Sequence, residues 1–118
     1  MKKTTKLLSI VALVATLFFA ACKKEDTPAP VADFTILPND TIEFFDTLRL
    51  TNTSTNADTY LWNFGDGTTS TLTNPIKASF NRPGTSTGCT ETYTITLTAT
   101  KNGKSSTKSK TVLVGYCL

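Results

Sequence analysis

The sequence predicts an all-β protein, a sandwich of two sheets built from about seven to eight short antiparallel strands. The segments after residue 30 alternate threonine with apolar residues, which is the pattern of strands with one buried face. Turn-forming residues separate them at intervals of roughly eight to twelve residues, and no segment after residue 21 has helical periodicity. The expected strands span residues 32–37, 41–45, 47–53, 59–64, 68–72, 76–80, 92–100 and 104–114.

The first three expected strands each carry apolar residues that can face a core. In the first, Phe34 and Ile36 lie on one side, and a Pro-Asn-Asp turn follows. The second is a short edge piece that contains the adjacent Phe44 and Phe45. The third alternates cleanly and directs Leu48 inward.

The central strand is the most aromatic segment of the chain. Tyr60, Trp62 and Phe64 alternate with smaller or polar residues, so their three rings lie on one face. A face of this size needs a second layer to cover it. The run Gly65-Asp66-Gly67 then reverses the chain, because glycine reaches positive φ without steric cost and aspartate bonds the backbone of turns.

The last two expected strands form a hairpin. Threonine alternates with apolar residues over 92–100, and Asn102-Gly103 predicts a two-residue type I′ turn. This turn pairs Lys101 with Lys104 and fixes the register of both strands. Between the central strand and the hairpin, Pro75 separates two shorter strands.

The central run Trp62-Asn63-Phe64-Gly65-Asp66-Gly67 resembles the W-D-F-G-D-G signature of PKD domains, a family of extracellular Ig-like β-sandwich modules. Pro83-Gly84 before a threonine-alternating strand also fits the family, and the resemblance spans about Val31 to Gly115. Residues 78–80 depart from it, since they read Ala-Ser-Phe where the family has His-x-Tyr. The extra loop 85–91 is a second departure. The resemblance implies an Ig-like fold with the tryptophan in the core and the aspartate as a turn residue.

The hairpin register brings two cysteines close together. Continued from the turn, it places Cys89 opposite Tyr116, and one β-bulge in the last strand would move Cys117 into that place. We therefore expect a Cys89–Cys117 disulfide in an oxidising compartment. The alternative is two free thiols.

Residues 1–21 have the features of a signal peptide. Lysines precede an apolar run of 15 residues, Leu7 to Ala21, which is shorter than the roughly 20 residues of a membrane-spanning helix. Phe19-Ala20-Ala21-Cys22 resembles a bacterial lipobox. The resemblance implies that Cys22 carries acyl chains such as palmitate and attaches the protein to a membrane. The alternative is an ordinary secretory signal.

Residues 22–30 form the expected tether. Lys23-Lys24-Glu25-Asp26 resembles the export signal of surface lipoproteins, which implies an outer-membrane lipoprotein exposed on the cell surface. The alternatives are a solvated charged spacer and a periplasm-facing protein. Thr27-Pro28-Ala29-Pro30 continues the tether in extended geometry.

Residues 31–118 form one domain, because only 97 of the 118 residues remain after cleavage. The chain has 12 Lys and Arg against 9 Asp and Glu, but three of the lysines lie in the signal peptide. The mature chain is therefore formally neutral, which argues against a nucleic-acid surface.

The sequence offers little catalytic chemistry. It contains no histidine, which excludes Ser-His and Cys-His nucleophilic sites, and it has no phosphate-binding glycine loop. We expect no enzyme and no cofactor. Asp40, Glu43 and Asp46 are weak candidates for a Ca²⁺ site, and the alternative is a charged edge that blocks aggregation.

The expected function is a non-catalytic, lipid-anchored binding or adhesion module of the cell envelope, with a glycan or protein ligand. The alternative is a structural spacer or an accessory subunit of an outer-membrane complex. The candidate ligand contacts on and beside the extra loop are Ser86, Thr87, Gly88, Thr90 and Tyr116. Tyr116 is the aromatic ring expected to be exposed. A second contact loop is expected at residues 54–58.

Overall fold

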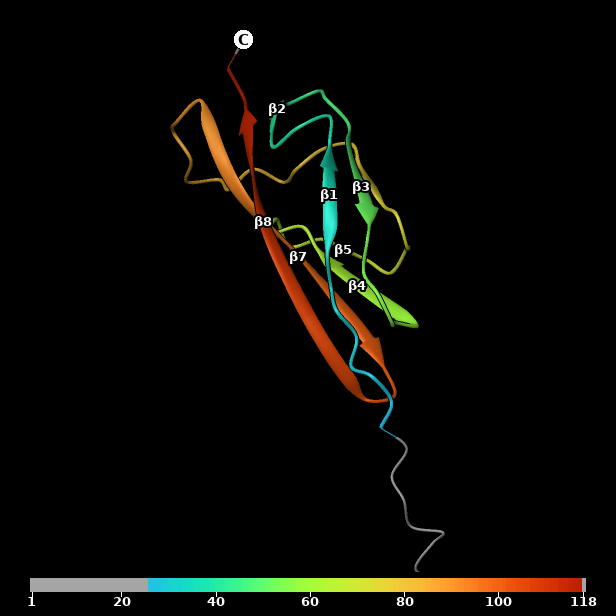
Figure 1. Cartoon of the computed structure of the whole chain (residues 1–118). Coiled ribbons are helices and arrows are strands. Elements are labelled where there is room, and N and C mark those ends of the chain that lie inside the picture. Colours follow the sequence, from blue (N-terminus) through green and yellow to red (C-terminus); the bar gives the residue numbers. More distant parts are fainter. Residues whose placement is uncertain (1–25, 118) are drawn as a thin grey trace, which may run out of the picture.

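The structure, a computed structural model, describes residues 26–117 as eight strands in two facing sheets (Figure 1). The signal peptide and Cys22 lie outside the described residues, so both stay predictions. Within residues 26–117 there is no helix long and apolar enough to cross a membrane. The strands are β1 (Phe34–Leu37), β2 (Thr41–Glu43), β3 (Leu48–Asn52), β4 (Thr59–Asn63), β5 (Thr69–Ser70), β6 (Ile76–Lys77), β7 (Thr90–Lys101) and β8 (Lys104–Gly115).

The two sheets have the strand orders β1-β3-β6 and β2-β8-β7-β4-β5. All pairs are antiparallel except β2 with β8, which are parallel. The expectation of a wholly antiparallel sandwich is therefore wrong at this edge. The turn after β1 carries the chain across to the other sheet, where the Leu113 amide donates to the Asp40 carbonyl over 2.8 Å.

The core lies between the sheets and is built from alternate residues of the longer strands. Trp62 is fully buried, its ring meets that of Phe34 edge to face at 5.1 Å, and its Nε1 donates to the Leu72 carbonyl over 2.8 Å. The lone tryptophan thus joins the two layers without leaving its polar atom unpaired. The buried apolar residues are Ala32, Phe34, Ile42, Leu48, Leu50, Trp62, Phe64, Phe80, Tyr93, Ile95, Leu97, Ala99, Val112 and Val114.

The β7–β8 hairpin is the longest element and confirms the predicted register. Lys101 pairs with Lys104, and pairing continues without interruption to Thr90 and Gly115. Asn102 and Gly103 have φ values of 49° and 75°, as a type I′ turn requires.

Strand bounds differ from prediction mainly at the short strands. The second strand ends at Glu43 because the next residues turn, and the strands predicted over 68–72 and 76–80 shrink to two residues each. The seventh begins at Thr90 rather than residue 92, because the long partner strand continues to pair with it.

The described chain begins and ends at opposite ends of the sandwich (Figure 1). Residues 26–31 run beside the β7–β8 turn, where the Lys104 ammonium donates to the Thr27 carbonyl over 3.0 Å. We call this the N-terminal end. At the other, far end lie the turn after β2, the loop before β7, and the end of β8 (Figure 1).

Candidate functional site

The turn after β2 is closed by two hydrogen bonds between its first and last residues. The Asp46 amide donates to the Glu43 carbonyl over 2.9 Å. The Asp46 carboxylate in turn accepts from the Glu43 amide over 3.1 Å. Phe44 and Phe45 therefore occupy the two central positions of a tight turn.

These two phenylalanines are exposed. Phe45 is 74% exposed and Phe44 is 37% exposed, and their rings pack edge to face with centroids 5.0 Å apart. Central turn positions normally carry Gly, Asn, Asp, Pro or Ser. Residues that break a local rule in this way are expected at functional sites, and a rigid apolar pair on the surface suits the binding of a partner.

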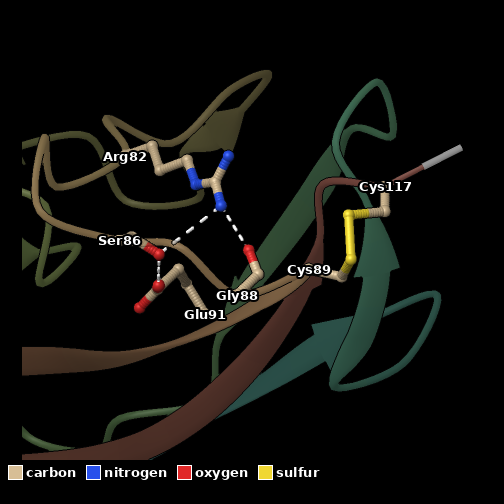
Figure 2. The surroundings of a disulfide bond; sticks show 6 residues. All are labelled: Arg82, Ser86, Gly88, Cys89, Glu91 and Cys117. Atoms are coloured by element: carbon tan, nitrogen blue, oxygen red, sulfur yellow. Dashed lines mark hydrogen bonds between the residues drawn. A yellow bond between two sulfur atoms is a disulfide. The ribbon is translucent and has the colours of Figure 1, made fainter.

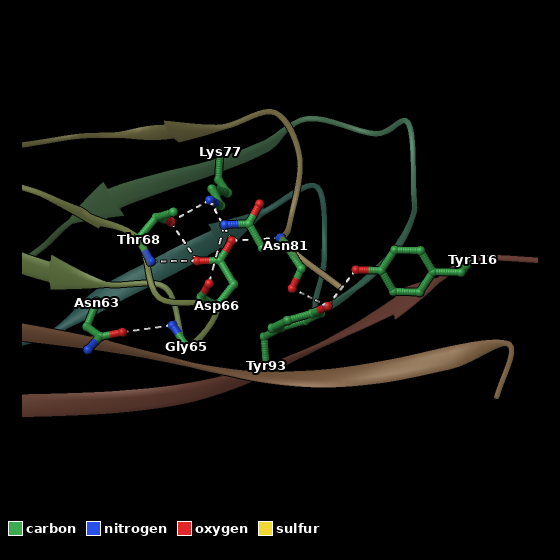
Figure 3. Close-up of polar contacts among 8 residues, drawn as sticks. All are labelled: Asn63, Gly65, Asp66, Thr68, Lys77, Asn81, Tyr93 and Tyr116. Carbon is green, nitrogen blue, oxygen red and sulfur yellow. Dashed lines mark hydrogen bonds and ion pairs between the residues drawn. The ribbon is translucent and has the colours of Figure 1, made fainter. Parts of the chain in front are cut away.

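Tyr116 packs against the pair through the ring of Phe44. Its ring lies 5.1 Å from that of Phe44, and the Arg82 guanidinium lies 4.8 Å from its ring centre. Its hydroxyl is 2.6 Å from the Tyr93 hydroxyl (Figure 3). The Tyr93 hydroxyl also donates to the Asn81 carbonyl over 3.2 Å. Burial, and then the hydrogen bond with Tyr116, raise the pKa of Tyr93. The expectation that Tyr116 is the exposed ring is wrong, because it is half-buried against the core.

The disulfide Cys89–Cys117 is present and closes the far end, with its Cα atoms 4.9 Å apart (Figure 2). The predicted β-bulge is absent, since the register is unbroken to the last pair of the hairpin. The Tyr116 amide donates to the Cys89 carbonyl over 2.7 Å, and Cys117 reaches its partner just beyond the end of β8.

The extra loop is held by a guanidinium. Arg82 donates to the Gly88 carbonyl and, over 3.5 Å, to the Ser86 hydroxyl, which itself donates to Glu91 (Figure 2). Ser86 and Gly88, predicted as ligand contacts, therefore form hydrogen bonds that hold the loop together. Thr87 and Thr90, also predicted, are exposed.

We define the far-end cluster as Phe44, Phe45, Tyr116 and Arg82. Of these four residues, only Tyr116 was predicted from the sequence as a ligand contact. The signal for the two phenylalanines was a Phe-Phe pair between two acids, which breaks the alternation of a strand. No local signal marks the arginine as part of this cluster, because the Tyr116 ring that it contacts is far away in the sequence.

The other predicted contact loop, 54–58, lies at the N-terminal end. The Asp58 amide donates to the Thr100 carbonyl over 2.9 Å, and the Asn56 side chain donates to the Ala29 carbonyl over 3.2 Å. The structure therefore does not bring the two predicted contact loops together.

Asp66 fixes the glycine turn to a distant segment. Its carboxylate lies 2.8 Å from the Lys77 ammonium and accepts from the amides of Asn81 and Thr68 over 2.9 and 3.1 Å (Figure 3). Burial acts to raise the pKa of Asp66, but the hydrogen bonds from Lys77, Thr68 and Asn81 outweigh it and lower the pKa to about 2. With its oxygens engaged in this way, Asp66 acts as a structural residue.

The weak Ca²⁺ candidates do not form a cluster. Within residues 26–117 no three acidic or cysteine side chains gather where they could hold a metal ion. Asp46 uses its carboxylate to close the turn with Glu43, and Asp40 contributes its carbonyl to the Leu113 amide.

Comparisons with known proteins agree with this architecture. A family model described as "PKD domain" matches residues 27–114. The PKD1 domain of Vibrio anguillarum Epp is similar, with 26% identity and a TM-score of 0.59 over 78% of this chain and 100% of that chain. The PKD1 domain of the Vibrio cholerae metalloprotease PrtV has 30% identity and a TM-score of 0.56 over 75% of this chain and 99% of that chain. No curated protein matches the chain.

Proposed function

The chain belongs to the PKD domain family, and from this premise we propose that it is a lipid-anchored, non-catalytic module of the cell envelope that binds a glycan or protein ligand with its far end. PKD domains are generally adhesion or structural modules. The observation that carries the proposal is the exposed Phe44–Phe45 pair on a hydrogen-bonded turn.

The position of the far-end cluster supports this function. The described chain starts at the N-terminal end, and the predicted lipidation site, Cys22, precedes it by a few residues. A membrane attached there would lie on the side away from the turn after β2 (Figure 1). The cluster would then face outward, where a ligand can reach it.

The binding test uses the intact protein, purified in a non-ionic detergent, on a glycan array and as bait with cell-surface proteins. We expect a bound glycan or protein that is lost when both phenylalanines are changed, in Phe44→Ser/Phe45→Ser. Leu72→Ser is the matched control, because Leu72 is 64% exposed and lies outside the cluster. Ligand retained by the double variant, or absent from both screens, would refute this function.

Protease treatment of intact cells tests the location. Cleavage of the domain on intact cells would support surface display, whereas protection until the outer membrane is permeabilised would support a periplasm-facing protein. Either result is compatible with lipidation, but only the first supports ligands outside the cell.

A spacer or accessory role is the second candidate. It is favoured by the long β7–β8 hairpin, which runs between the two ends of the sandwich (Figure 1). A spacer would co-purify with envelope proteins whether or not the two phenylalanines are replaced, so the same double variant separates the two functions.

A further inference from the structure

Four carboxylates in the turns and loops toward the far end form no ion pair within residues 26–117. Glu43 and Asp46 flank the two exposed phenylalanines in the turn, Asp40 precedes the first residue of β2, and Glu91 lies beside the extra loop. The three ion pairs within residues 26–117 involve other acids. They are Lys77–Asp66, Lys101–Asp58 and Lys110–Asp33.

The cations nearest this end do not neutralise it. Arg82 is held over the Tyr116 ring and by the Gly88 carbonyl. Arg49, near the start of β3, and Lys110, which lines the same surface pocket as Asp40, bring the count to three cations against four carboxylates. The far end is therefore acidic as well as aromatic.

The N-terminal end, where the β7–β8 turn lies, carries lysines instead. The hairpin has four lysines along its length, of which Lys104 and Lys108 have no ion pair with any residue in the described range. The lysines on this hairpin are Lys101, Lys104, Lys108 and Lys110. Within the described residues, lysines without an ion pair thus lie on the hairpin and carboxylates without an ion pair lie at the far end, although the mature chain is formally neutral.

We propose that the far-end cluster binds a segment of another protein that is rich in lysine and arginine. This inference rests on the proposed binding function and names the chemistry of its partner. Ring faces attract cations, and the aliphatic stems of Lys and Arg can lie along phenylalanine while their charges meet Glu43 and Asp40. A polyanion would be repelled here, and a neutral glycan would leave the carboxylates unused.

The surface is prepared for such a partner before binding. The Glu43–Asp46 hydrogen bonds close the turn, Tyr116 supports Phe44, and the disulfide fixes the chain end behind it. Little conformational freedom is then lost when the partner docks. Attraction between opposite charges also makes the association sensitive to salt.

The test measures binding of a fluorescein-labelled oligoarginine peptide to the intact protein in non-ionic detergent, with an oligoglutamate peptide as the opposite-charge probe. We expect oligoarginine to bind more weakly as salt is raised, and oligoglutamate not to bind. Phe45→Ser should lower the affinity about tenfold, the usual size for loss of an aromatic contact. Asp40→Asn/Glu43→Gln should lower the affinity and flatten its salt dependence.

Asp58→Asn is the matched control, because it removes one charge at the N-terminal end and should leave binding unchanged. Unchanged thermal midpoints show that the far-end variants remain folded. Failure to bind oligoarginine, or equal binding by the far-end variants, overturns the inference. If a glycan on the array is bound through the two phenylalanines while oligoarginine is not, the inference fails and the proposed function stands. If no glycan, no cell-surface protein and no oligoarginine binds, both fail.

Discussion

Gly65 occupies a position at which the fold accepts no side chain. Its φ is +77°, and a Cβ there would lie 2.6 Å from the Thr94 carbonyl oxygen and 2.9 Å from the Thr94 nitrogen. Gly67 has a similar φ of +86°, but a Cβ added to it would meet no atom of the described chain within 4 Å. Both glycines of this turn therefore need a positive φ, but only Gly65 also lacks room for a side chain.

This difference gives a paired prediction. Gly65→Ala should lower the free energy of unfolding by about 3 kcal/mol, since it combines positive φ with a backbone clash. Gly67→Ala should cost only about 1 kcal/mol, because only the conformational strain remains. Urea denaturation of both variants measures the difference, and equal losses would contradict the contact between Gly65 and Thr94.

Asp66 makes stability depend on pH in the acid range. Its folded pKa, about 2, lies below the ordinary value of 3.8 because the hydrogen bonds from Lys77, Thr68 and Asn81 outweigh the opposing effect of burial. The carboxylate therefore stabilises the fold fully above its ordinary pKa, and this contribution is lost as the pH falls through about 2.

We expect the Asp66 carboxylate to contribute about 2 kcal/mol above a pH of about 4. Unfolding free energies measured at a series of pH values should fall toward acid for the wild type and change less for Asp66→Asn. Asp58→Asn is a suitable control, because its carboxylate is 60% exposed in a 3.5 Å pair with Lys101. The same acid dependence in Asp66→Asn would assign the effect to other groups.

At the level of elements, the β7–β8 hairpin determines where the disulfide forms. The type I′ turn sets the register, and the register brings Cys89 to Tyr116 and so to the neighbouring Cys117. The cysteines are 28 residues apart, so the bond restricts a sizeable loop of the unfolded chain.

Cys89→Ser and Cys117→Ser should each lower the free energy of unfolding by about 3–4 kcal/mol in the chain-entropy model. The two losses should agree, because either change opens the same loop. Reduction of the wild type should produce a similar loss. Two thiols that react with an alkylating agent in the unfolded, non-reduced protein would contradict the disulfide.

At the level of the whole molecule, the proposed membrane attachment depends on Cys22. Cys22→Ser should move the protein from the membrane fraction to the soluble fraction, because several acyl chains on one residue are what gives stable attachment. Immunoblots of fractionated cells and the mass of the mature N-terminus measure this. A membrane-bound Cys22→Ser protein would refute lipidation at this position.

Much of the fold was predictable because its signals are local. Threonine alternation, the glycine turn around Asp66 and the Asn102-Gly103 hairpin each depend on a few neighbouring residues, and all eight expected strands are present. The hairpin register then extended this local information to the disulfide. The family resemblance also holds, since the PKD family matches residues 27–114.

The candidate site was predictable only in part. The sequence pointed to the extra loop and to Tyr116, and the structure places both at the far end. It could not show that Phe44 and Phe45 leave the strand and become exposed, because that depends on β2 crossing to pair in parallel with β8. Nor could it pair Lys77 with Asp66, whose contact forms only when separate segments pack.

The sequence by itself thus determined the sandwich, its hairpin register and the bonded cysteines, since alternation and turn chemistry act between near neighbours. Only the tertiary structure decided that Phe44 and Phe45 are exposed while Tyr116 is half-buried, and which charges form ion pairs. These properties depend on the meeting of residues far apart in the chain. They leave the rings of Phe44 and Phe45 exposed, whereas Trp62 is buried as the sequence predicted.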